Sequence, residues 1–194
     1  MLKLNRLGYT ACMLAGLVFG AAATAQTSSG ANQGAESQQL SEKSVNLITK
    51  FALTTIPSEI KQPDGSVLKI DIENVDKIVV PVDDARRIIM VARNSAHAQI
   101  CDMPELQAEN YLALMRMEQA KNKWSKEQML FINRLHLFTV MWLTGNVQLV
   151  EKGDGEKPEV ISTPKSTKVE ECKPEDKDSV KANIEAFLKS VQKS

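Results

Sequence analysis

His97 and Cys101 stand four residues apart, so in a helix they share one face. Met90 falls on the same row, and His136 lies on a later apolar segment that could face it. Imidazole and sulfur ligands suit zinc or copper(I). A periplasmic protein that handles a metal or a small molecule near His97 and His136 is therefore the alternative interpretation of this chain.

Cys101 is more simply explained as one half of a disulfide. Once Cys12 is assigned to a removed leader, Cys101 and Cys172 are the two cysteines that remain, 71 positions apart. An even pair in an exported chain predicts a disulfide, and a disulfide sulfur is not a thiolate ligand. We therefore expect a Cys101–Cys172 bond, no metal and no cofactor.

The motifs of the common hydrolases are missing. The chain has no G-x-S-x-G elbow, no H-E-x-x-H and no S-x-x-K with its partner motifs. Glu105 and Glu109 share a helix face, but such pairs are common in the first turns of helices, where they favour the helix dipole. The sequence therefore predicts no enzymatic activity.

The N-terminus has the three parts of an export signal. Lys3 and Arg6 precede an apolar run over residues 11–23, and small residues at Ala23 and Ala25 indicate cleavage before Gln26. The apolar run is shorter than the roughly 20 residues that a membrane span needs. We expect residues 1–25 to be a cleaved signal peptide, the mature protein to be periplasmic or secreted, and no stable membrane insertion after cleavage.

The mature chain is slightly acidic. Removing Lys3 and Arg6 leaves 22 basic residues against 24 acidic ones, which argues against nucleic acid as a partner. Residues 26–39 are polar and rich in Gly and Ser, and they predict a flexible leader. Residues 40–194 are expected to form a single helical domain.

The predicted fold is mainly α, a compact bundle of about five helices. Apolar spacing, capping residues and helix breakers place the helices at 40–56, 84–101, 103–122, 126–144 and 180–191. A charged loop over 151–178 leads to the last of them, which docks one narrow face. A small β element of two or three strands, over residues 66–72, 77–80 and 147–150, stays open as an addition.

The 126–144 segment is apolar almost all round. One face carries Phe131, Leu135, Phe138 and Trp142; the other two carry Met129, Ile132, Val140 and Leu143, and Leu130, Leu137 and Met141. Such a helix is buried by its own chain or covered by a partner. Taking the first face as a partner-contact face, we expect a non-enzymatic protein that acts through a protein partner or as a homo-oligomer.

Overall fold

The structure, a computed structural model, describes residues 40–147, 149–151, 159–162 and 172–192. These residues belong to one compact unit, Gln39–Ser194. The predicted signal peptide 1–25 and leader 26–39 lie outside the described residues. The mainly helical prediction is confirmed. The long helices are α2 (Glu42–Leu53), α3 (Val82–Ile100), α4 (Pro104–Ala120), α5 (Lys126–Leu143) and α6 (Pro174–Val191).

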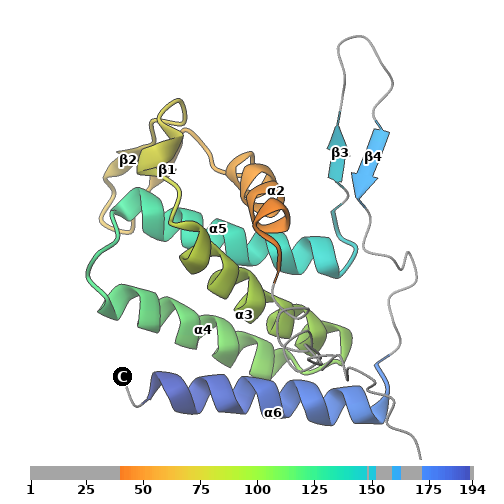
Figure 1. Cartoon of the computed structure of the whole chain (residues 1–194). Helices are drawn as coiled ribbons and strands as arrows, with labels where there is room; N and C mark the ends of the chain where they lie inside the picture. The colour runs from red at the N-terminus through yellow and green to blue at the C-terminus, as the bar shows by residue number, and fades with distance from the viewer. Residues whose placement is uncertain (1–39, 148, 152–158, 163–171, 193–194) are drawn as a thin grey trace, which may run out of the picture. The chain divides into compact units, whose positions relative to one another are not determined.

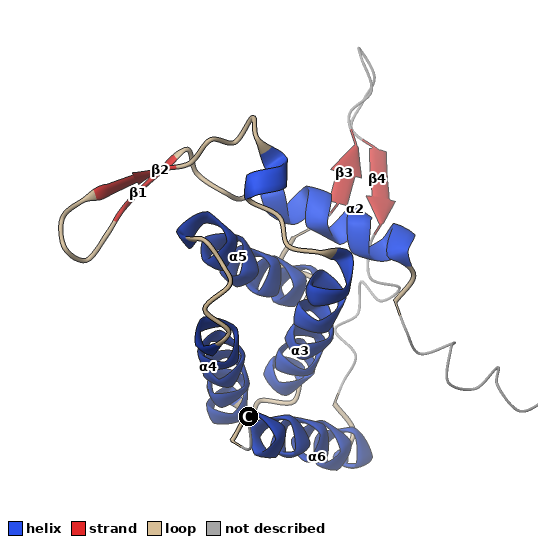
Figure 2. Cartoon of the chain, turned by 60° about the vertical axis from the view of Figure 1, so that its left-hand side comes forward, coloured by secondary structure: helices blue, strands red, loops and turns tan. Residues whose placement is uncertain are grey.

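Helix α3 is the centre of the bundle and packs against α2, α4, α5 and α6 (Figures 1 and 2). Its buried stripe matches the apolar spacing of the sequence: Ala85, Ile88, Ile89, Ala92 and Ala96. Ala85, Ile88 and Ile89 form the main core with residues of α2 and α5, whereas Ala92 and Ala96 pack with Val140 of α5 in a smaller cluster.

Short connections fix how α4 and α5 follow α3. Asp102 and Asn122 adopt positive φ angles of 54° and 49° at the ends of α3 and α4. Ser125 then opens α5 with a capping box, in which Ser125 Oγ accepts from the Gln128 amide and Gln128 Oε1 accepts from the Ser125 amide. This box confirms the helix start that the sequence predicts.

Two separate hairpins replace the single β element of the sequence prediction. Strands β1 (Glu59–Lys61) and β2 (Val67–Lys69) pair antiparallel, and β2 falls inside the expected 66–72 range. The possible strand over 147–150 is present in part, as Leu149 and Val150 of a strand, but it does not join this sheet. Strand β3 (Leu149–Glu151) pairs instead with β4 (Glu159–Ser162).

The strand expected over 77–80 is also wrong. Residues Val75–Lys77 form a short 3-10 helix, η1, and the Ile78 and Val79 amides both bond back to the Val75 carbonyl. The Val79 carbonyl accepts from the Gln128 side chain at 3.1 Å, so it makes no ladder bond. Ile78 and Val80 are buried in the core, so their β-branched side chains are explained by burial and do not require a strand.

Helix α6 begins at Pro174, six residues before the expected 180–191 range. The expected 151–178 loop therefore includes the start of α6 and the whole of β4, and its remaining residues lie mainly outside the described ones. Figure 1 shows α6 running alongside α4. No helix in the described part of the chain combines the length and the apolar content needed to cross a membrane.

Candidate functional site

Helix α5 is apolar on three sides, and the chain itself encloses the side expected to meet a partner. Phe131 and Leu135 are fully buried, Phe138 is 7% exposed and Trp142 is half-buried against the main core. The ring of Phe51 from α2 stacks on Phe138 at 6.4 Å between centroids. The prediction of a partner-contact face here is therefore wrong, because α2 and α3 cover it.

The second apolar side of α5 is also largely enclosed, but the third is not. Ile132 and Val140 are buried, whereas Leu137 is 43% exposed. Leu130 and Met141, one or two turns away on the same side, are half-buried. We call Leu130, Leu137 and Met141 the α5 surface row.

A neutral polar cluster lies inside the bundle where α3, α4 and α5 meet. Asn110 Nδ2 donates to the Val91 carbonyl and to Ser95 Oγ, both at 2.9 Å. Ser95 Oγ lies 3.1 Å from Nε2 of His136. Ser95 Oγ therefore links the Asn110 side chain to the imidazole, and the histidine tautomer sets which of the two atoms donates in the Ser95–His136 bond.

This polar cluster resembles the serine nucleophile and histidine base of a hydrolase, but both side chains are buried. Ser95 is fully buried and His136 is 5% exposed, with the Tyr111 ring tilted against the imidazole at 5.1 Å. Burial lowers the pKa of His136 to about 4, so at neutral pH the ring is uncharged and a weak base. Ser95 has no exposed surface, and the hydrogen bonds of the cluster join α3, α4 and α5.

The metal alternative loses its strongest ligand. Cys101 and Cys172 form the predicted disulfide, with their Cα atoms 5.0 Å apart, so Cys101 offers no thiolate. His136 Nε2 is engaged by Ser95, while His97 and Met90 are half-buried on α3. Within the described ranges, no group of three or more His, Cys, Asp or Glu side chains is placed to hold a metal ion.

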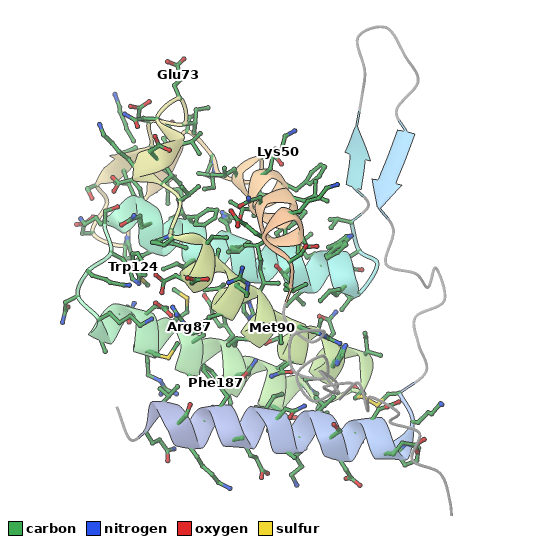
Figure 3. The ribbon with its side chains drawn as sticks, viewed as in Figure 1. Lys50, Glu73, Arg87, Met90, Trp124 and Phe187 are labelled. Carbon is green, nitrogen blue, oxygen red and sulfur yellow. A yellow bond between two sulfur atoms is a disulfide. The ribbon has the colours of Figure 1, made fainter. Side chains whose placement is uncertain are left out.

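A charged cluster, which the sequence did not reveal, joins the start of α3 to the end of α4. The Glu118 carboxylate is fully buried and accepts from Arg87 at 2.9 Å, from Lys121 at 2.9–3.0 Å and from the Trp124 indole at 2.8 Å. Figure 3 shows Arg87 and Trp124 at the same end of the bundle. Asp84 completes the cluster by pairing with Arg87 at 2.6 Å and with Lys123 at 3.2 Å.

Charge balance sets the pKa values in this charged cluster. Burial alone would raise the pKa of Glu118, but the hydrogen bonds from Lys121, Trp124 and Arg87 outweigh it, and the pKa lies below its ordinary value. The pKa of Asp84 is also lowered. Burial would raise this pKa, but the hydrogen bonds from Arg87 and Lys123 have the larger effect. Both acids are therefore ionised and satisfied, which suits a structural clamp and not a proton donor.

The loop after β2 and the first residues of η1 form an open acidic depression, lined by Asp71, Glu73, Asn74, Val75 and Asp76. Figure 3 shows Glu73 pointing away from the body of the protein. The depression has no basic or buried polar partner among these lining residues, so it is a solvated surface.

The described residues thus contain two polar clusters that hold helices together and one apolar row that reaches the surface. In the described residues, neither cluster combines an accessible nucleophile with a base. Comparison of the chain with protein-family models, with curated proteins and with solved structures finds no match.

Proposed function

We propose that this protein is an exported, non-catalytic helical protein that acts by protein–protein contact through the α5 surface row. The observation that carries the proposal is the exposure of Leu137, which stands at 43% between half-buried Leu130 and Met141. Exposed apolar side chains that lie together mark contact sites, whereas single ones are common on any protein surface. The α5 surface row places three apolar side chains at helical spacing on one side, and contact with a partner accounts for them.

The disulfide supports the exported part of this proposal. Bonds of this kind form and persist in oxidising compartments such as the periplasm. The Cys101–Cys172 bond agrees with the export signal expected at residues 1–25.

The α5 surface row is small, and this limits the kind of contact that it supports. A stable interface covers about 800 Å² on each partner, which is more than three side chains provide. Lys126, Glu127 and Arg134 lie along the same outward side and are exposed or half-exposed, so they supply a polar rim. We therefore propose a weak or transient contact centred on Leu137.

The test places a photo-crosslinking amino acid at position 137 of the exported protein in living cells. Position 112 on α4 is the matched control, because Leu112 is a helical leucine of similar exposure, 51%. The expected result is a defined adduct from position 137 and none from position 112, and Leu137→Glu should weaken the contact where Leu112→Glu does not. Equal labelling from both positions, or no adduct from either, would overturn the proposal.

A further inference from the structure

Helix α6 is held to the bundle in a different way from the other helices. Only Val180 and Ile184 of its 18 residues are buried. These two pack into a small apolar cluster of their own with Ala98, Cys101 and Met103, separate from the main core. Phe187, on the side of α6 that faces α4, is the one α6 residue that packs against the main core among those described (Figure 3).

The disulfide adds a covalent attachment at the start of this weakly buried helix. Cys101 is the C-cap of α3, and Cys172 precedes the first residue of α6, Pro174, by two positions. The bond keeps the N-terminus of α6 beside the end of α3, where Ala98, Cys101 and Met103 form the small apolar cluster. It therefore raises the effective concentration of the α6 apolar stripe at that cluster.

We propose that the Cys101–Cys172 disulfide is a redox-sensitive latch: while it is closed α6 stays docked on α3 and α4, and when it is reduced α6 leaves the bundle while the main core stays folded. The separation of the two apolar clusters makes this local opening feasible, because losing the small cluster leaves the packing among α2, α3 and α5 intact. Opening uncovers apolar side chains of α3 and α4, namely Ala98, Met103 and Leu106.

Two exchange steps with an external dithiol open the latch. A thiolate of the dithiol attacks Cys172 Sγ, which is more accessible than the 6%-exposed Cys101. The S–S bond breaks, and Cys101 leaves as a thiolate that takes up a proton. The second thiol of the reductant then displaces Cys172, so the reductant ends as a disulfide and both protein cysteines end as thiols.

The position of the leaving sulfur makes this opening slow. Cys101 ends α3, where the helix dipole disfavours a negative charge. A thiolate formed there is a poorer leaving group than one in solvent. We expect dithiothreitol to reduce this bond more slowly than an exposed disulfide of a short peptide.

The test is hydrogen exchange, read by mass spectrometry, on the mature protein before and after reduction by dithiothreitol. In the oxidised protein, peptides from α6 should be protected. After reduction their exchange should speed up at least tenfold, while peptides from α3 and α5 change less than twofold. A Cys101→Ser/Cys172→Ser double variant, measured without reductant, should reproduce the reduced pattern.

Two outcomes would overturn the latch. Unchanged protection of α6 after reduction at every protein concentration would show that apolar contact alone holds it. Loss of protection throughout the bundle would show that the bond stabilises the fold as a whole. If reduced α6 is protected only at high concentration, with the mass of a dimer, then α6 has left its own bundle to dock on a second copy, which supports release. Ile184→Ala should speed α6 exchange in the oxidised protein, where α6 is docked on this cluster, and Leu112→Ala on α4 should not.

Discussion

The neutral polar cluster and the charged cluster both fasten α3 to α4, but they do so with opposite chemistry at different points along the helix. Ser95, Asn110 and His136 are 5% exposed or less, and none is charged. The charged cluster lies at the first turns of α3, where Arg87 and Lys123 keep contact with solvent at 36% and 48% of their side-chain surface. Of these two clusters, the one that contains charged side chains is therefore the one in which solvent and several hydrogen-bond donors compensate for their burial.

This difference explains why neither cluster suits catalysis. Inside the bundle, the uncharged state of His136 costs least, because an imidazolium there would lack both water and a carboxylate. At the margin, Glu118 stays ionised because Arg87, Lys121 and Trp124 satisfy it. The pKa values of His136 and Glu118 are both lowered, away from neutral pH, whereas a general acid or base works best when its pKa lies near the working pH.

The largest expected effect is the acid sensitivity of the neutral polar cluster. Folding lowers the pKa of His136 to about 4 from an ordinary value of 6.5, so between these values the unfolded chain binds the extra proton. The free energy of unfolding should therefore fall as the pH falls from 6.5 to 4, by about 3 kcal/mol in total. Urea unfolding of wild type and His136→Gln at several pH values tests this. Parallel pH curves for the two proteins would contradict it.

A smaller loss should follow from neutralising the centre of the charged cluster. Glu118→Gln keeps the volume but removes the charge that faces Arg87 and Lys121, and we expect a loss of about 2 kcal/mol at neutral pH, discounted for their exposure. Because the pKa of Glu118 is lowered from 4.5, its stabilisation is present above pH 4.5 and disappears as the pH falls through the folded value. The variant should therefore approach wild type in stability at low pH. Glu109→Gln, exposed on the same helix, is the control and should change little.

Removing the hydroxyl at the centre of the neutral polar cluster should cost less. Ser95→Ala leaves His136 Nε2 without its hydrogen-bond partner and one Asn110 hydrogen without its acceptor. We expect a loss of about 1 to 2 kcal/mol in denaturant unfolding. Arg93→Ala, exposed on the same helix, should stay within about 0.5 kcal/mol of wild type. Equal losses in the two variants would show that the hydrogen bonds of Ser95 contribute nothing.

The smallest effect is expected at the solvent edge of the charged cluster. Lys123 pairs with Asp84 at 3.2 Å and lies 4.1 Å over the Trp124 ring. Since Lys123 is largely exposed, Lys123→Ala should cost about 0.5 kcal/mol at low salt and less at high salt. Unfolding at two salt concentrations, with Lys126→Ala as control, measures this. A salt-independent loss above 1 kcal/mol would remove the contrast between the edge and the centre of the cluster.

Apolar spacing predicted much of the fold but less of the surface. The α3 stripe and the α5 capping box follow from local rules, and the disulfide follows from cysteine number. The outward side of α5 could not be chosen among three apolar ones, because only the placement of α2 and α3 decides which is covered. The run Ile78–Val80 misled for a similar reason: β-branched residues suit a buried irregular segment as well as a strand.

The charged cluster could not be predicted, because its parts look ordinary one by one. Glu118 stands in a helix among other charged residues, and nothing local marks it as the one that is fully buried. Arg87 lies 31 positions earlier, and their meeting depends on how α3 and α4 fold back on each other. Asn110 escaped notice likewise, since its partners Val91 and Ser95 are on another helix.

The position of the two cysteines also fixes when the disulfide can form during protein synthesis. A ribosome finishes Cys101 well before Cys172, which follows 71 positions later, so α4 and α5 are already synthesised when the second sulfur arrives. A chain that stops short of Cys172 keeps a lone thiol at the end of α3. A closed bond therefore shows that synthesis has passed position 172, whereas a free thiol at Cys101 marks a chain that is either truncated before that position or reduced.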